Sequence, residues 1–389
     1  MPHNSLEISI ILASCRLELD NSLDSIFKKN SNNINWEILI QTGYEHGVNS
    51  LLCNSLLKVK TEYIPEQIYH ASIAHLKQQQ ETNQQLSDQL VYILNVLKDK
   101  NIDTISFKGP TLAISAYKQL KFRSFRDLDF LIHESDIQQC LDTLRELGYV
   151  HNWDLTPRQW QEFINYAGED ILFGEGVPIE PHWAFAPSTL ALNIDYEGIW
   201  KRAIHIEFNG QSLRSLSTED NLIILCVHGC KEEWTKLKWV VDVSEFIRSH
   251  PEMDWELIFR LTTSQGLARI VNIGLALSHK LVQAPIPNIA LEWMSKDKFA
   301  AKWTEQLADN FFITNNTDLD IWKPGKFHWS MRERLIDRLR YFFQTISQPR
   351  VQYFADIKLP DKLFFLYWPY KLLHDFIVLP VWIFIKKFR

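Results

Sequence analysis

A short run of β-branched residues that stops at a glycine turn most constrains the fold of this chain. Residues 102–107 predict a strand, Lys108-Gly109-Pro110 predicts a turn, and residues 111–119 predict a helix. Charged and apolar side chains alternate over residues 127–132, which predicts a second strand. This order of elements places a sheet in the middle of the chain.

Helices are predicted before the sheet, because apolar residues recur at intervals of three and four. The core-facing positions of the last of these helices are Leu86, Leu90, Ile93, Leu94 and Leu97. Shorter helices are predicted near residues 36–39 and 44–52, and Pro65 begins a turn before a Gln-rich helix around residues 77–85.

The chain returns to helix after two more short strands. These strands are predicted at residues 170–173 and 178–183, and Gly174 and Gly176 form a hairpin-like turn between them. Ser217 or Thr218 caps a following helix, and later helices are predicted over residues 236–247 and 255–281. The second half of the chain is therefore mainly helical.

Together these elements predict an α+β fold, in which a small twisted mixed sheet is flanked by N-terminal and C-terminal helical regions. We expect a helical region at residues 1–100, an α/β core at 101–215 and helices packed on that core at 216–308. Residues 309–389 would form a polar connection, with residues 309–330 as its mobile part, and an apolar aromatic tail.

Composition excludes several classes of protein. A chain of 389 residues with 46% hydrophobic content can bury a large core, and its net charge of −6 argues against a general binder of duplex DNA. The five cysteines are odd in number and scattered, which indicates a reducing, cytoplasmic setting. Cys226 and Cys230 flank His228, but without a second ligand pair we interpret them as buried helix thiols rather than a zinc site.

The two ends of the chain carry different signals. No secretion signal precedes the first polar residues, since Glu7, Arg16 and Glu18 interrupt the apolar run. Residues 363–385 are apolar and aromatic, but charged residues interrupt them, and Pro369 and Pro380 are expected to break a helix. Two alternatives stay open for this tail: it packs on the protein or a protein partner, or it lies on a membrane surface, beside Lys386, Lys387 and Arg389.

Asp127 and Asp129 are the first candidates for chemistry. On a strand, residues two apart face the same side, so the two carboxylates can share a metal ion. Neighbouring buried carboxylates repel each other, and a hard cation such as Mg²⁺ would compensate them. The same letters at Asp318-Leu319-Asp320 follow Asn315-Asn316-Thr317 and lead into no strand, so we interpret that second pair as a solvated loop or a helix cap.

The setting of Asp127 and Asp129 strengthens the prediction. Lys108 and Gly109 end a strand and begin a helix, where backbone N–H groups and a lysine can hold phosphates. Arg123 lies four residues before Asp127 and would either hold a triphosphate oxygen or pair with the aspartates. A phosphate site and a metal site are thus predicted next to each other.

A third carboxylate, Glu180, lies on a later strand that can pair with the first two. His182 faces the same side and would either orient the metal or acceptor or form a hydrogen-bonded part of the core. Pro181 between them predicts that this strand is an edge strand or contains a bulge.

The motifs Phe107-Lys108-Gly109-Pro110, Asp127-Leu128-Asp129-Phe130 and Ile179-Glu180-Pro181-His182-Trp183 resemble a known family. It is the uncharacterised bacterial nucleotidyltransferase family of the DNA polymerase β-like superfamily, and the likeness covers roughly residues 30–280. Further points of likeness are Trp36-Glu37, His46-Gly47-Val48, His228-Gly229, Trp234, Leu237-Lys238-Trp239 and Asp242.

The resemblance implies transfer of a nucleoside monophosphate from an NTP, with ATP the expected donor, to a small-molecule, peptide or RNA acceptor, with release of pyrophosphate. Mg²⁺, or Mn²⁺ in its place, would lie on Asp127, Asp129 and Glu180, and Lys108, Gly109 and Arg123 would bind the nucleotide. His182, His228 and Asp242 would lie at the acceptor or behind the metal-binding residues. Trp234 and Trp239 are expected to pack in the core.

Two departures from the superfamily pattern leave a second function open. Lys108-Gly109 replaces the usual Gly-Ser, so a hydroxyl contact to phosphate is missing, and Glu180 replaces the more usual Asp. The alternative is a catalytically inactive nucleotide-binding or regulatory module with the same fold.

Overall fold

The computed structural model describes residues 5–18, 22–312, 322–379 and 381. The N-terminal region is helical, as predicted. Its last helix, α5, is a single helix of 34 residues that joins two segments predicted separately, because no Gly or Pro interrupts it. All five predicted core-facing leucines and isoleucines of this helix are buried. The N-terminal helices are α1 (Leu6–Ser14), α2 (Ser22–Asn30), α3 (Trp36–Glu45), α4 (Asn49–Leu56) and α5 (Glu66–Asp99).

A seven-stranded mixed sheet forms the centre of the molecule, and its strand order is β3-β4-β5-β2-β1-β7-β6. The predicted strands at residues 102–107, 127–132, 170–173 and 178–183 correspond to β1, β2, β4 and β5. The strands are β1 (Thr104–Ser106), β2 (Leu128–Ile132), β3 (Val150–His151), β4 (Leu172–Phe173), β5 (Ile179–His182), β6 (Ile204–Phe208) and β7 (Gln211–Ser215). The predicted α+β fold is confirmed.

Strands β2 and β5 run parallel, and their register places Asp129 beside Glu180. The expectation that Pro181 confines β5 to an edge or a bulge is wrong, because β5 lies between β4 and β2. The C=O of Pro181 accepts from Asp170 N, so the missing N–H of the proline faces the β4 side. Leu172 pairs with Ile179 and Glu169 with His182 in the same antiparallel register, so Pro181 lies within this short pairing and costs it a single N–H donor.

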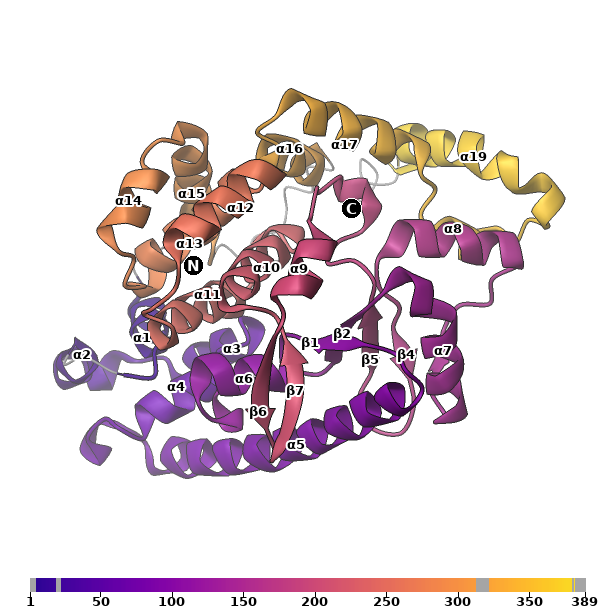
Figure 1. Ribbon diagram of the computed structural model, residues 1–389. Coiled ribbons are helices and arrows are strands. Elements are labelled where there is room, and N and C mark those ends of the chain that lie inside the picture. Colours follow the sequence, from indigo (N-terminus) through magenta and orange to yellow (C-terminus); the bar gives the residue numbers. More distant parts are fainter. Residues whose placement is uncertain (1–4, 19–21, 313–321, 380, 382–389) are drawn as a thin grey trace.

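The two faces of the sheet are covered by different helices. Leu128, Phe130 and Ile132 of β2 pack in one cluster with α5 and α7 (Ile137–Glu146). On the opposite face Leu131 packs with Ile105, Phe107 and Ile224, the last from α10 (Thr218–Lys231). Figure 1 shows α5 running along one side of the sheet, with α10 and α11 on the other. Alternation along β2 therefore turns Asp129 toward the α10 face.

Helices complete the remaining chain. Ser217 caps α10 by accepting from Asp220 N, as predicted, and of the one or two helices predicted over residues 255–281 two are present, separated at Gly266. The connecting and C-terminal helices are α6 (Gly109–Tyr117), α8 (Pro157–Ala167), α9 (Tyr196–Arg202), α11 (Leu237–Ser249), α12 (Trp255–Gln265), α13 (Ala268–Val282), α14 (Asn288–Met294) and α15 (Lys298–Asn310).

The C-terminal segment is also helical where the structure describes it. Asp318 and Asp320 lie outside the described residues, as does Pro380, and the second half of the predicted mobile connection forms α16. Pro369 does not break α19, because it lies in the first turn, where its missing N–H has no helical partner to lose. The elements are α16 (Trp322–Met331), α17 (Leu335–Ser347), α18 (Val351–Asp356), the 3₁₀ helix η6 (Asp361–Leu366), α19 (Tyr367–Leu373) and the π-helical turn η7 (His374–Val378).

One side of the tail packs on the core. Tyr353, Phe354 and Tyr367 are buried in the same cluster as the α5 and α7 side chains. Within the described ranges, no helix is both long enough and apolar enough to cross a bilayer.

Candidate active site

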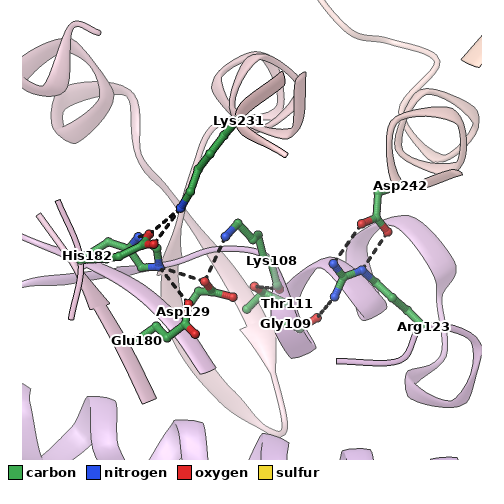
Figure 2. A network of polar contacts seen from close by, with 10 residues as sticks. Lys108, Gly109, Thr111, Arg123, Asp129, Glu180, His182, Lys231 and Asp242 are labelled. Carbon is green, nitrogen blue, oxygen red and sulfur yellow. Dashed lines mark hydrogen bonds and ion pairs between the residues drawn. The ribbon is translucent and has the colours of Figure 1, made fainter. Parts of the chain in front are cut away.

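Three side chains from neighbouring strands converge on one point of the α10 face. Asp129 and His182 are almost completely buried, at 2% and 1% exposure, and Glu180 is half-buried beside them. His182 Nε2 lies 2.9 Å from Asp129 Oδ1 and 3.9 Å from Glu180 Oε2. One ligand atom from each residue lies within 4.8 Å of the others, and Figure 2 shows the three side chains pointing toward one another.

The turn between β1 and α6 places a lysine against this cluster. Lys108 has φ 53° and Gly109 has φ 35°, and the positive φ of Lys108 is strained for a residue with a side chain. The turn is held by Thr111, whose hydroxyl donates to Lys108 O over 2.9 Å. Lys108 Nζ then donates to Asp129 Oδ1 over 3.0 Å (Figure 2). Strain stored at such a turn is typical of residues positioned for function.

The buried charges perturb one another. Burial and the carboxylates of Asp129 and Asp127 raise the pKa of Glu180 to about 7. Burial and Asp129 also raise the pKa of Asp127, which lies one residue before β2 and is half-buried. Burial works against the charge of Asp129, but Lys108 and His182 hold the pKa of Asp129 well below its ordinary range. The charge of Asp129 is thus compensated by its neighbours, whereas the carboxylates of Asp127 and Glu180 are left in mutual repulsion.

His182 links the cluster to a second charge pair. Its Nδ1 lies 3.0 Å from Glu169 Oε2, and Lys231 Nζ donates to both oxygens of Glu169, at 2.7 and 3.0 Å. Burial opposes the charge of His182, but Glu169 and Asp129 raise the pKa of His182 to about 9. A chain of alternating charge therefore runs from Lys231 on α10 through Glu169 and His182 to Asp129 (Figure 2).

Arg123 pairs with Asp242 of α11 and with neither of the aspartates near it in sequence. Its Nε and Nη2 donate to the two carboxylate oxygens of Asp242 over 2.8 and 2.9 Å. Nη1 donates to Gly109 O over 3.5 Å, and Tyr117 Oη donates to Asp242 Oδ1 over 2.6 Å. All four residues are buried, and this network ties α11 to the Gly109 turn (Figure 2).

Lys238 brings another cation to the same region. Its backbone is bonded to the N-terminal helical region, because Lys238 N donates to His46 O over 3.0 Å. At Gly47, with φ +69°, an added Cβ would lie 2.9 Å from Lys238 Cδ, so a side chain there would strain the turn and press on Lys238. Burial and Arg123 lower the pKa of Lys238, while Asp242 and Asp127 act in the opposite direction.

His228 lies near these cations without a charge of its own. Burial, Lys108 and Lys231 lower the pKa of His228 well below its ordinary value, and its ring meets Trp239 edge to face at 5.8 Å. Trp239 and Trp234 are buried in the main hydrophobic cluster, so their predicted packing role is confirmed. Gly229 makes room for Trp234, whose ring carbon lies 2.4 Å from the position of an added Cβ.

Sequence reasoning missed three charged residues at this site. Glu169 precedes a predicted strand and Lys231 ends a predicted helix, so neither stands in a motif that would identify it. Lys238 is different, because it lies within the Leu237-Lys238-Trp239 motif, which marked the position without assigning it a role. The cysteines Cys226 and Cys230 beside His228 are free and buried, as predicted.

A cavity of about 970 Å³ adjoins the charged cluster. Its wall includes Gly168, Trp183 and Ala184, which are chain neighbours of Glu169 and His182. Further along, the rings of Trp200 and His133 stack at 3.8 Å between centroids. None of the three predicted acids lines this cavity, which therefore provides room beside the cluster rather than within it.

Comparison with known proteins gives a family and two distant structural likenesses. The solution structure of the antibiotic-resistance factor ANT(2'')-Ia matches at 11% identity and a TM-score of 0.32, over 45% of this chain and 89% of that one. The crystal structure of an antigenic nucleotidyltransferase-like protein from Paracoccidioides brasiliensis matches at 16% identity and a TM-score of 0.32, over 55% of this chain and 92% of that one. No curated protein matches the sequence.

The family match is more extensive. The model of a family described as uncharacterised nucleotidyltransferase matches residues 32–283, which include the whole charged cluster and more than half of the chain. This range agrees with the resemblance inferred from the motifs. The chain belongs to the uncharacterised nucleotidyltransferase family.

Proposed function

We propose that this protein is a magnesium-dependent nucleotidyltransferase that moves a nucleoside monophosphate from an NTP, with ATP the expected donor, to an acceptor hydroxyl and releases pyrophosphate. The observation that supports this most strongly is the register of β2 and β5, which sets Asp129 beside Glu180 within reach of the Lys108 turn. Such an NTP-dependent reaction and the free thiols fit a cytoplasmic protein.

Asp127, Asp129 and Glu180 would hold the Mg²⁺, and Mn²⁺ would suit the same oxygens. The donor set fits, because carboxylate oxygens are preferred by hard cations. The raised pKa values of Asp127 and Glu180 fit as well, since they reflect burial and carboxylate repulsion, and a cation would relieve the repulsion. A bound ion would neutralise the triphosphate and polarise the acceptor hydroxyl.

The turn at Lys108 and Gly109 would bind the phosphates. The first N–H groups of α6 have no helical acceptor, and the N-terminal end of a helix favours an anion. Lys108 and Lys238 would add positive charge on either side. Arg123 donates to Gly109 O and to Asp242, so we assign it to holding the turn in place.

Glu180 would take the proton of the acceptor hydroxyl while the acceptor oxygen bonds to the α-phosphorus and the bond to pyrophosphate breaks. The pKa of Glu180 is about 7 without a metal ion, and a bound cation would lower it, so Glu180 would be deprotonated and able to accept a proton at neutral pH. His182 would orient Asp129 through its 2.9 Å contact, and Glu169 would hold His182 in turn.

We propose a small molecule as the acceptor, rather than a peptide or RNA. The adjoining cavity, at about 970 Å³, has the size of a small-molecule pocket. Its stacked His133 and Trp200 rings and the nearby Arg214 guanidinium offer an apolar surface and a positive charge. Intact-mass analysis of small-molecule, peptide and RNA fractions after incubation with protein, ATP and Mg²⁺ tests this choice.

Substitution of the aspartates tests the assignment of the site. Asp127→Ala and Asp129→Ala should each abolish Mg²⁺-dependent ATP binding in calorimetry and pyrophosphate release, with Asp99→Ala on the exposed end of α5 as control. Unchanged binding and release in both variants would show that the site is elsewhere.

One observation favours the inactive nucleotide-binding module as a second candidate. Asp129 is already compensated by Lys108 and His182, so it is stable without a metal ion. Tight binding of Mg²⁺ and ATP with no pyrophosphate release across the acceptor fractions would support that candidate.

A further inference from the structure

Helix α17 buries its polar face and exposes its apolar face, the reverse of an ordinary surface helix. It buries the polar residues Asp337 and Tyr341 against the protein. Its apolar residues recur at helical spacing on the opposite, outward face. The exposed set is Leu335, Ile336, Leu339, Phe342 and Phe343. A soluble surface helix normally has the reverse arrangement, so this apolar face requires something to cover it.

The segment from η6 to η7 repeats this arrangement. Lys371 is buried and pairs with Asp375 over 2.6 Å, and both lie on the inward side. The outward side again carries apolar residues at intervals of three and four. They are Phe365, Leu366, Trp368, Leu373, Phe376 and Ile377.

The two segments are neighbours. Trp368 Nε1 donates to Ser347 O at the end of α17 over 3.0 Å. Residues of both segments, including Tyr341 and Lys371, line one cavity of about 990 Å³. Figure 1 shows α17 and α19 along the same edge of the molecule, away from the sheet. We call the outward residues listed for the two segments the apolar edge.

Charge is distributed unevenly between this edge and the rest of the chain. Residues 322–389 contain 13 Lys and Arg but only 5 Asp and Glu, a net charge of +8. The whole chain carries −6, so residues 1–321 carry −14. The apolar edge therefore belongs to a strongly basic segment of an acidic protein.

We propose that the apolar edge lies on the surface of an anionic lipid bilayer. Basic helical segments with aromatic and aliphatic faces bind such surfaces by burying the apolar face among the lipids while Lys and Arg meet the headgroups. Trp and Tyr are favoured at this depth. Among the described helices none can span a bilayer, which agrees with binding along its surface. A neutral protein partner would match the apolar residues but not the positive charge.

Vesicle sedimentation of the full chain tests the proposal. The probe is vesicles of phosphatidylcholine with about 30 mol % phosphatidylglycerol, compared with pure phosphatidylcholine. Phe343→Ser combined with Phe365→Ser should lower the partition coefficient at least about tenfold, because two apolar contacts with lipid are lost. Phe299→Ser on α15 is the matched control, since Phe299 is 61% exposed and Phe343 is 64% exposed. Raised salt should weaken wild-type binding.

The outcomes separate lipid from other occupants. Circular dichroism and thermal unfolding should be unchanged in the double variant, because both side chains are exposed. Binding that the double variant loses and the control keeps supports the proposal. It is overturned if wild type does not sediment with anionic vesicles, or if the double variant binds them equally well. It is also overturned if the edge instead mediates a dimer that the double variant dissociates and that vesicles leave intact.

Discussion

Asp129 of β2 and Glu180 of β5 stand side by side in the parallel pairing of the two strands, and His182 Nε2 lies within 3.9 Å of both. Two acids from distant parts of the chain are thereby held on one face of the sheet. Asp129 is compensated by Lys108 and His182, whereas Glu180 is not compensated to the same degree. This difference leads to a test of the electrostatics that needs no substrate.

Glu180→Gln should stabilise the metal-free protein at high pH. The pKa of Glu180 is raised from 4.5 to about 7, so between these values the folded protein keeps a proton that the unfolded chain has released. Stability falls as pH rises through this window. The free energy of unfolding of the variant should therefore exceed that of wild type by roughly 1–3 kcal/mol at about pH 8. At about pH 5 the difference should be much smaller. Denaturant titrations at both pH values measure this, and an equal difference at both would contradict it.

Glu169→Gln should lower the pKa of His182. Glu169 is the largest contribution that raises this pKa from 6.5 to about 9. The stabilisation from the charged imidazole is complete below about pH 6.5 and is lost as pH rises through 9. NMR titration of the imidazole protons should show a decrease of roughly one unit or more, and the loss of stability should be largest below pH 6.5.

Glu146→Gln is the control for that measurement, because Glu146 is an exposed glutamate paired only with Lys100 at 3.4 Å. If His182 titrates in Glu169→Gln as it does in wild type, the chain of charges from Lys231 to Asp129 has no electrostatic role.

Asp242→Asn should destabilise the fold strongly. It leaves the buried guanidinium of Arg123 without a counter-charge, and such losses are typically about 3–5 kcal/mol. The pair Arg145 and Asp142 has a similar distance, 2.7 Å, but is exposed, so Asp142→Asn should change stability by less than about 1 kcal/mol. Chemical denaturation of both variants measures the contrast, and equal effects would show that burial of the Arg123 pair has little energetic consequence.

Gly47→Ala should cost more than Gly210→Ala, although both residues have positive φ, +69° and +72°. In both variants the alanine should lower stability by about 1 kcal/mol through backbone strain. At Gly210 an added Cβ meets nothing within 4 Å, whereas at Gly47 it meets Lys238 Cδ at 2.9 Å. We expect a further loss of about 1 kcal/mol for Gly47→Ala and weaker ATP binding, measured by thermal unfolding and calorimetry. Equal effects of the two substitutions on stability and ATP binding would show that the His46 turn does not support the site.

Much of the fold could be predicted from the sequence, because local rules decide it. The alternation over residues 127–132 placed a strand and turned Asp129 toward the α10 face, while Asp127 lies one residue before the strand. The Ser217 cap located the start of α10 within one residue. The site could be predicted in part, since Lys108, Asp129 and Glu180 each stand beside a recognisable strand or turn and do come together.

Tertiary structure alone decided the partners of the charged residues. Arg123 lies four residues from Asp127, yet it pairs with Asp242 from a helix more than a hundred residues later. Glu169 reaches His182 through an antiparallel bridge between the two residues, and Lys231 reaches Glu169 from the end of α10. A lone charge has no periodicity, so the sequence carries no signal for its partner.

The two faces of the C-terminal helices show the same division. The helix over residues 335–347 was not predicted, although its apolar residues recur at helical spacing. That spacing does not determine which face of the helix is buried. That depended on partners inside the protein: Asp337 pairs with Arg334 over 2.5 Å, and the guanidinium of buried Arg332 lies over the ring of Tyr341, so this face turns inward.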